Sequence, residues 1–423
     1  MIILLIILFF IFGAPLFTII GAFAITGFSS IETSSAAIII ELYRLASQPV
    51  LIAIPLFTFA GYLLAESNAP KRILNFSQAL LGWLPGGVSI VVLMVCALFT
   101  AFTGGSGITI IALGGLVYPI LLSEKFSEKF SLGLVTTTGS LGLLFAPSLP
   151  LIVYGIVAEV SIDKLFLAGI VPGIILIFSI SIYSFFQAGE SNVSKHHFSF
   201  KILFDATKQI LWELPLPFLI LFGIYFGWFT TMEAASITAV YVFIVEVLIL
   251  KDVKFKTDLP KIINESMVMV GAILMILATA MGLTSFLIDE QVPQKLFELV
   301  SKYISDEWVF LIVLNIFLII VGMMMDIFSA LIVVVPLIIP ISAQYNIDPV
   351  HLGIIFILNL EIGYLTPPVG LNLFLSSFRF KKSIGTITKS VIPFIVILII
   401  CLILITFIPE LSIGIFKFVN LNL

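Results

Sequence analysis

Long apolar runs follow one another along the whole chain. They are continuous rather than alternating between apolar and polar residues, which favours membrane-spanning helices over the strands of a membrane barrel. The runs predicted to span are residues 50–64, 88–102, 165–186, 214–229, 237–250, 267–288, 309–325 and 391–407. Residues 1–28 form another apolar run, without a basic start or a small-residue cleavage site, and are predicted to be a retained first span rather than a signal peptide. The pattern therefore predicts an all-α polytopic membrane protein.

Composition supports this class and excludes several others. Of 423 residues 61% are hydrophobic and 10% charged, with a mean hydropathy of +1.25, whereas a soluble domain has about a quarter charged residues. The net charge of −4 offers no basic face for nucleic acid. The sequence contains no GxxxxGK[ST] loop, so a nucleotide-driven pump is not predicted. The three histidines lie in polar stretches predicted as loops and the two cysteines lie in apolar runs, so neither an enzyme nor a protein cofactor or resident metal is predicted.

Two regions of the chain resemble each other. Three pairs of residues share a separation of 221 positions: Pro119 with Pro340, Gly142 with Gly363, and Pro147 with Pro368. In each region a polar, glycine-bearing segment, FTGGSG or GMMMD, precedes a later span that is interrupted at G-x-L-x-x-P. The prediction is a duplicated unit, with residues 1–190 as the first repeat and 191–423 as the second. The first holds a re-entrant hairpin at about 88–122 and a broken span at about 131–157, and the second a hairpin at about 308–342 and a broken span at about 351–378.

The interruptions point to a site within the membrane. Glycine frees the backbone and proline removes a hydrogen-bond donor, so a helix that carries both tends to unwind locally. Unwound backbone at membrane depth is tolerated only inside protein or beside a water-filled cavity. Paired broken helices in two repeats are the usual binding place for ions and solutes in secondary transporters. The alternative is that the glycines and prolines only permit close packing or kinks.

Two carboxylates stand beside the interruptions. Asp326 follows GMMM, and Glu361 precedes the second interruption. For Asp326 we expect a structural role, in which the carboxylate accepts hydrogen bonds from the free amides of a broken helix. Glu361 could bind a cation or a proton, or could serve as such a cap, and the sequence leaves the choice open.

Neutral oxygens also flank the interruptions, on Thr103, Ser106, Thr366 and Asn372. Together with unwound carbonyls they suit a small hard cation such as sodium, which needs several oxygens but no buried charge. Any one of these hydroxyls could instead bond back to a carbonyl one turn earlier. Lysines gather at residues 195–208 and 251–261, and the positive-inside rule predicts that both loops are cytoplasmic.

Several segments carry a likeness to a known family. AIPLFTFAG (53–61), LFLAGIVPG (165–173), FTTMEAASITA (229–239), GMMMDIFSALIVVVPLIIP (322–340) and IGYLTPPVGLN (362–372) resemble the large membrane subunit of the tripartite ATP-independent periplasmic (TRAP) transporters. The resemblance implies two inverted repeats with re-entrant hairpins and discontinuous helices, which is an elevator-type ion transporter fold. It also implies sodium-driven import of a small organic acid, such as a dicarboxylate or sugar acid, across a bacterial inner membrane. The implied partners are a small membrane subunit of about four spans and a periplasmic substrate-binding protein.

The resemblance also assigns residues to sites. One sodium site would be formed by Thr103, Gly104, Gly105, Gly142, Phe145 and Pro147, with Phe145 contributing only its carbonyl. The other would be formed by Gly322, Gly363 and Thr366. A carboxylate substrate would lie between the two hairpin tips, near Ser106 and Asn372.

The chain departs from the family pattern in places. Thr109 stands where many members have an aspartate, FAPSLP replaces a common double proline, and Glu361 occupies a position that is often small or neutral. No particular substrate is therefore transferred. The alternative function is a stand-alone sodium-coupled carrier of divalent anions that needs no periplasmic partner.

Overall fold

The computed structural model describes residues 14–30, 36–84, 86–190, 199–226, 228–304 and 306–417. Within these ranges every regular element is helical, so the prediction of an all-α protein is confirmed. Seven helices are long and apolar enough to cross a membrane, or up to nine if two bent pairs are each counted as one span. The start of the predicted first span, His196 and His197 fall outside the described residues.

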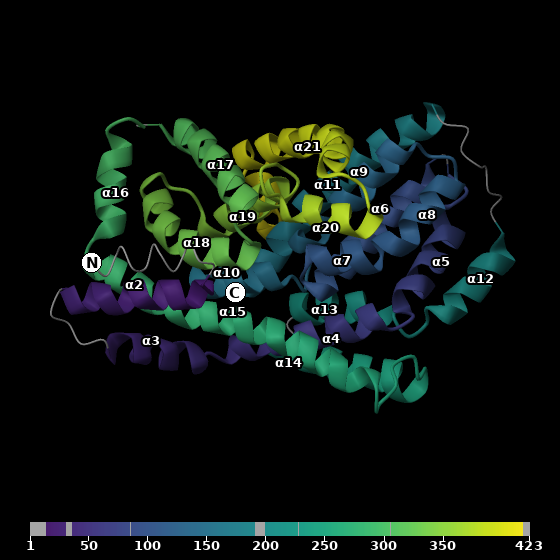
Figure 1. Cartoon of the computed structure of the whole chain (residues 1–423), viewed down its shortest axis with the longest axis horizontal. Helices are drawn as coiled ribbons and strands as arrows, with labels where there is room; N and C mark the ends of the chain where they lie inside the picture. The colour runs from purple at the N-terminus through teal and green to yellow at the C-terminus, as the bar shows by residue number, and fades with distance from the viewer. Residues whose placement is uncertain are drawn as a thin grey trace.

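The lower layer in Figure 1 consists of long helices that run along the longest axis of the molecule. Its members are α2 (Leu16–Ser30), α3 (Ala36–Ala46), α4 (Ala53–Glu66), α13 (Pro215–Tyr225), α14 (Thr231–Phe243) and α15 (Asp258–Asp289). α15 packs against α2, α3 and α4, and α14 packs against α4 and α13. α14 begins with a capping box in which Thr230 and Glu233 bond to each other's backbone amides, and it ends in a π-helical turn, Ile244–Ile249.

The upper layer holds both regions that the sequence predicts to be broken (Figure 1). Its first part consists of α6 (Gly87–Thr103), α7 (Ser106–Ala112), α8 (Gly114–Ser123), α9 (Glu128–Thr138), the 3-10 turn η2 (Leu141–Leu144), α10 (Leu149–Val157) and α11 (Ile162–Glu190). Its second part consists of α17 (Glu307–Met324), α18 (Ile327–Gln344), α19 (Pro349–Tyr364), α20 (Leu371–Phe380), α21 (Ile384–Phe407) and α22 (Glu410–Ile413), followed by the 3-10 turn η4 (Gly414–Lys417).

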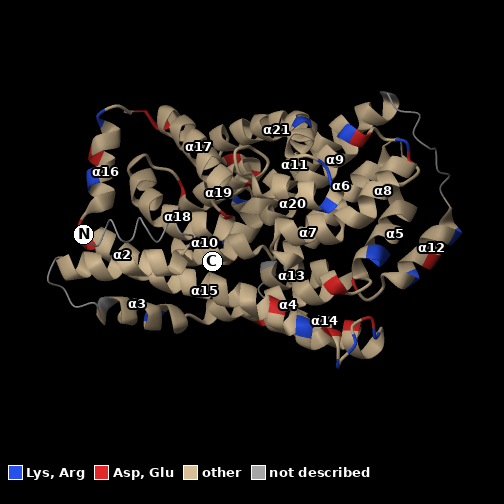
Figure 2. Cartoon of the chain, viewed as in Figure 1, with Lys and Arg blue, Asp and Glu red and all other residues tan. Residues whose placement is uncertain are grey.

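Shorter helices lie at the two ends of the molecule. α5 (Ala69–Leu81) and α12 (Phe200–Gln209) pack together at the right end in Figure 1, and α16 (Val292–Ser301) lies at the left end. Charged side chains gather toward these ends, whereas the middle of the molecule is mostly uncharged (Figure 2). A segment that crosses the hydrocarbon core gains from being apolar. The charge distribution therefore fits a bilayer normal along the longest axis.

The centre of the upper layer is α19. From Val350 to Tyr364, 15 of its 16 residues are buried, so it is surrounded by protein on every side. Asp348 begins the helix by accepting hydrogen bonds from the amides of Val350 (2.8 Å) and His351 (3.2 Å). The sequence placed His351 in a loop, and this was wrong. Its ring is buried in α19 and contacts Ser412 Oγ at 2.7 Å and the Thr406 carbonyl at 3.2 Å.

Candidate functional site

The first interruption is the turn between α6 and α7. Gly104 ends α6 with a φ of +65°, and its amide donates to the Thr100 carbonyl at 2.8 Å. This left-handed conformation favours glycine. Thr103, immediately before the turn, is fully buried, and its Oγ1 has no hydrogen-bond partner in the described part of the chain. The turn therefore holds a buried hydroxyl oxygen that is free to meet a ligand.

The first broken span lies against this turn. α9 and η2 are followed by α10 at an angle of 44°, and residues 145–148 between η2 and α10 are not helical. A Cβ on Gly142 would lie 2.1 Å from the Ala97 carbonyl oxygen, so η2 rests directly on α6. A Cβ on Gly104 would lie 2.5 Å from Leu149 Cγ, which brings the start of α10 to the turn. The structure thus brings the first hairpin and its partner span together.

The remaining residues assigned to the first sodium site lie nearby with different exposure. Gly105 is partly buried and starts the turn into α7, while Pro147 is buried between η2 and α10. The ring of Phe145 lies against α11, since a Cβ on Gly173 would be 2.5 Å from Phe145 Cζ. The Phe145 amide donates to the Gly142 carbonyl at 3.0 Å.

A hydroxyl pair stands close to the first turn. Thr100 Oγ1 lies 2.7 Å from Thr109 Oγ1. It is also within hydrogen-bonding distance of the carbonyl oxygens of Cys96 (2.8 Å) and Gly139 (3.0 Å). Thr109 is the residue at the position where the resemblance led us to expect an aspartate. Here the position links α7 to α6 through a neutral hydrogen bond.

The second interruption brings two backbones into direct contact. A Cβ on Gly363 would lie 2.5 Å from the carbonyl carbon of Gly322 and 2.9 Å from the Ile319 carbonyl oxygen. α17 and α19 can approach this closely only because both residues at the contact are glycines. After α19 the chain is not helical at residues 365–370, and the Gly370 amide donates to the Met323 carbonyl at 3.2 Å. This bond joins the unwound segment to the end of α17.

Thr366 and Asp326 differ in their freedom to bind an ion. Thr366 Oγ1 donates to the Ile362 carbonyl at 2.8 Å, which is the back-bonded arrangement that the sequence left open. Asp326 is exposed and caps α18 by accepting from the amides of Phe328 (3.0 Å) and Ser329 (3.1 Å). The structural role expected for Asp326 is therefore the one observed.

The two residues assigned to the substrate lie on neighbouring helices. Ser106 starts α7 and is 4% exposed, and Asn372 lies in the first turn of α20 and is fully buried. α7 and α20 are in contact, since a Cβ on Gly107 would lie 2.9 Å from Leu375 Cδ1. Neither amide atom of Asn372 has a hydrogen-bond partner among the described residues. A buried, unpaired amide is costly unless a ligand or water completes it.

Buried polar groups that the sequence left open or missed lie on α19. Glu361 is fully buried and neither carboxylate oxygen has a partner within the described ranges. On another face Asn359 Nδ2 donates to Asn315 Oδ1 at 2.7 Å, and Asn315 Nδ2 donates to Thr406 Oγ1 at 3.1 Å. Asparagines inside apolar runs were the signal for this network. η2 also contacts α19, so the two broken regions meet inside the molecule.

Comparison with known families gives a match along almost the whole chain. Residues 2–411 match the family model described as "Tripartite ATP-independent periplasmic transporter, DctM component". The chain is 34% identical over 395 residues to the C4-dicarboxylate TRAP transporter large permease protein DctM of Pseudomonas aeruginosa, covering 93% of this chain and 92% of that protein.

A longer relative and a solved structure are also similar. The sialic acid TRAP transporter permease protein SiaT of Haemophilus influenzae is 30% identical over 370 residues, which cover 87% of this chain and 60% of that protein. The crystal structure of the Alcanivorax borkumensis YdaH transporter matches with a TM-score of 0.59, covering 89% of this chain and 88% of that one at 12% identity. The latter likeness concerns the fold alone.

Proposed function

The chain belongs to the DctM family of tripartite ATP-independent periplasmic transporters, and from this membership we propose that it is the permease of a sodium-coupled importer of a small organic acid. The observation that carries the proposal is the family match over residues 2–411. The chain is a multi-pass membrane protein and a TRAP large permease subunit. Its relatives are transporter permeases rather than enzymes.

Sodium coupling is supported by the chemistry of the two interruptions. Thr103, Gly104, Gly105, Gly142, Phe145 and Pro147 would form one sodium site, and Gly322, Gly363 and Thr366 the other. Both sets offer hydroxyl and backbone carbonyl oxygens, which suit a small hard cation. Thr103 Oγ1 is buried without a partner, so it can turn its lone pairs to an ion without breaking a bond.

An acidic substrate is supported by the relatives and by the site. The names of the two relatives specify C4-dicarboxylate and sialic acid, and both are carboxylic acids. Ser106 and Asn372 are the proposed substrate contacts. A hydroxyl and an amide can donate hydrogen bonds to a carboxylate, and the nearby helix N-termini of α7 and α20 add a favourable dipole.

A small membrane subunit and a periplasmic substrate-binding protein are the proposed partners, in a bacterial inner membrane. The relative SiaT is named a permease protein without the word "large", and about two fifths of its length lies outside the match. This extra length is consistent with a second membrane component fused to the large one.

Sodium-dependent thermal stability of the purified chain tests the ion sites without knowledge of the substrate. Binding to the folded state stabilises it by RT ln(1 + [Na⁺]/Kd), about 2.7 kcal/mol at 100 Kd. Sodium chloride should raise the melting temperature of the wild type above its value in choline chloride at equal ionic strength. Thr103→Ala should lose most of this gain, and Thr366→Ala less, because Thr366 already donates to a carbonyl.

Thr58→Ala is the matched control. Thr58 is also a fully buried helix threonine, and it bonds back to the Ile54 carbonyl at 2.7 Å in α4. Its sodium response should equal that of the wild type. A full sodium response in both Thr103→Ala and Thr366→Ala would refute the assignment of the sites.

Uptake into vesicles tests the tripartite arrangement. Candidate ¹⁴C-labelled dicarboxylates and sialic acid should accumulate only when a small subunit and a binding protein encoded beside the chain are added. Full uptake by the chain alone would instead favour the stand-alone carrier of divalent anions.

A further inference from the structure

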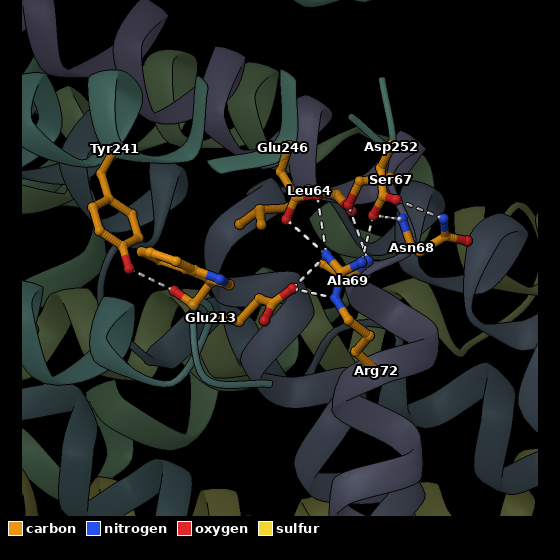
Figure 3. Close-up of polar contacts among 10 residues, drawn as sticks. Leu64, Ser67, Asn68, Ala69, Arg72, Glu213, Tyr241, Glu246 and Asp252 are labelled. Atoms are coloured by element: carbon orange, nitrogen blue, oxygen red, sulfur yellow. Dashed lines mark hydrogen bonds and ion pairs between the residues drawn. The ribbon is translucent and has the colours of Figure 1, made fainter. Parts of the chain in front are cut away.

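A group of charged residues lies where the lower layer turns into the short helix α5. Arg72, in the first turn of α5, is surrounded by three carboxylates from separate places in the sequence (Figure 3). Glu213 comes from the turn before α13, Glu246 from the π-helical turn after α14, and Asp252 from the loop that follows. We call these four residues the Arg72 cluster.

Every nitrogen of the Arg72 guanidinium has a carboxylate partner. Nε donates to Glu213 Oε1, and Nη1 donates to Asp252 Oδ2. Nη2 lies 3.0 Å from both oxygens of Glu246 and also forms an ion pair with Glu213. Each of the three guanidinium nitrogens therefore donates to at least one carboxylate.

The carboxylate oxygens of the cluster are all paired except one. Both oxygens of Glu246 accept from Arg72. Both oxygens of Asp252 accept from Asn68, Oδ1 from Nδ2 at 2.9 Å and Oδ2 from the backbone amide at 3.2 Å. Oε2 of Glu213 is buried and has no partner among the described residues. Glu213 is thus the carboxylate of the cluster that has a buried oxygen without a partner among the described residues.

The charges of the cluster do not balance. Three carboxylates and one guanidinium would carry a net charge of −2 if all were ionised. The side chains are little exposed, at 13% for Arg72, 3% for Glu213, 0% for Glu246 and 13% for Asp252. Like charges held close together with little water favour the uptake of a proton by one of them.

We propose that the Arg72 cluster binds one proton, on Oε2 of Glu213, and that this proton holds the start of α5 against α14 and the turn before α13. The proposal goes beyond sodium coupling and does not depend on it. With Glu213 neutral, Arg72 faces two ionised carboxylates instead of three. When the proton leaves, the added negative charge repels Glu246 and Asp252. This repulsion weakens the contact of α5 with α14 and with the turn before α13, which we call the joint.

The direction of the pH effect follows from the groups that face Glu213. Burial raises the pKa of Glu213, and the charge of Arg72 only partly offsets this. Burial would raise the pKa of Asp252 too, but the hydrogen bonds from Arg72 and Asn68 outweigh it and lower that pKa. Tyr241 also stands nearby, where its hydroxyl donates to the Trp212 carbonyl at 2.8 Å. Glu246 faces Glu213 as a second negative charge, since both carboxylates form ion pairs with Nη2 of Arg72. No further titratable group from the described ranges bonds to Glu213.

These shifts set the pH window. A raised pKa in the closed joint means that closure takes up a proton, so the contribution of Glu213 is present at acidic pH and is lost as the pH rises through its pKa. The lowered pKa of Asp252 means that its contribution is lost only as the pH falls through that low value. The joint should therefore be tightest at mildly acidic pH and loosen toward alkaline pH.

The joint matters mechanically because α5 leads from α4 into the first hairpin. The helix at the opposite end of the molecule, α16, leads from α15 into the second hairpin and has no such cluster. Its charged contact in the described structure is an exposed pair of Lys295 and Glu290, 3.8 Å apart. Protonation would thus act on the end of the molecule that carries the lysine-rich loop at 251–261.

Hydrogen–deuterium exchange of the full chain in lipid nanodiscs tests the proposal. The readout is the protection of amides 72–76, corrected for intrinsic exchange, between about pH 4.5 and about pH 8.5. Opening of the joint releases one proton, so the equilibrium constant for opening depends on pH. Between the pKa of Glu213 in the open state and its higher pKa in the closed state, this constant should rise about tenfold per pH unit. Wild-type protection should fall accordingly, whereas Glu213→Gln, which stays neutral, should give a flat profile.

Controls separate the cluster from general pH effects. Glu265→Gln removes an exposed carboxylate that pairs with Lys261 and should retain the wild-type profile, and amides 295–299 of α16 should show no such fall. Infrared titration of the wild type provides a measurement that needs no variant, because a protonated carboxyl band should disappear over the same pH range. A wild-type protection that does not vary with pH, a wild-type slope in Glu213→Gln, or the absence of a titrating carboxyl band would each overturn the proposal.

Discussion

A methyl group added to Gly363 should separate the second hairpin from the second broken span. In Gly363→Ala the Cβ would meet Gly322 C at 2.5 Å, Gly322 Cα at 2.6 Å and the Ile319 oxygen at 2.9 Å. All three atoms belong to backbone and cannot rotate away. To bring the shortest contact to the 3.4 Å of an ordinary contact, α17 and α19 must part by about 0.9 Å.

The energetic cost follows from the packing of the site. Forcing extra volume into a close-packed interior costs about 1–3 kcal/mol, which exceeds the gain of up to about 1 kcal/mol from replacing glycine by alanine within a helix. Gly322→Ala should cost less, because its Cβ would meet neighbours no closer than 3.0 Å. Gly271→Ala is the matched control, since Gly271 lies in α15 and its Cβ would meet nothing within 4 Å.

Thermal melting of the purified variants in choline chloride isolates packing from sodium binding. The melting temperature should be lowest for Gly363→Ala, intermediate for Gly322→Ala, and equal to or above the wild-type value for Gly271→Ala. If Gly363→Ala and Gly271→Ala have the same melting temperature, the close contact between Gly322 and Gly363 does not contribute to stability and the reasoning fails.

Two further substitutions test the turns themselves. In Gly104→Ala the new residue must adopt a φ of +65° and place its Cβ 2.5 Å from Leu149. This variant should lower the melting temperature by more than Gly105→Ala, in which the nearest contact of the Cβ would be 3.6 Å. Equal losses would contradict the role of the left-handed turn. Asp326→Ala should destabilise the chain by about 0.5–2 kcal/mol through loss of the cap of α18, and Asp326→Asn should recover part of this in urea titrations of the reconstituted protein. A stability of Asp326→Ala equal to that of the wild type would show that the cap is dispensable.

Local patterns in the sequence were sufficient to predict an all-α membrane protein and the places where its helices end. Glycine and proline act on the backbone of their own turn, so FTGGSG and G-x-L-x-x-P predicted interruptions that the structure has at residues 104–105, 145–148 and 365–370. Asp326 could likewise be predicted as a cap, because a cap bonds to amides two and three residues ahead. The assignment of particular residues to sodium or substrate remains a prediction that rests on the family resemblance.

Burial and long-range partners were decided by the tertiary structure. His351 reads as a loop residue in a polar stretch, yet its helix is enclosed on all sides and its ring bonds to residues beyond position 400. Thr103 and Thr366 look alike in sequence, and only packing leaves one hydroxyl free and the other bonded.

The sequence by itself determined a helical membrane protein with two interrupted spans, because hydrophobicity and backbone breaks are properties of neighbouring residues. Its motifs also resembled those of the TRAP family. The tertiary structure alone decided which charges share one environment. Arg72 lies 141 to 180 residues from the carboxylates of Glu213, Glu246 and Asp252, and no periodicity connects such distant positions. Their shared burial, and the proton that we propose it requires, exist only because α5, the turn before α13 and the end of α14 converge in the fold.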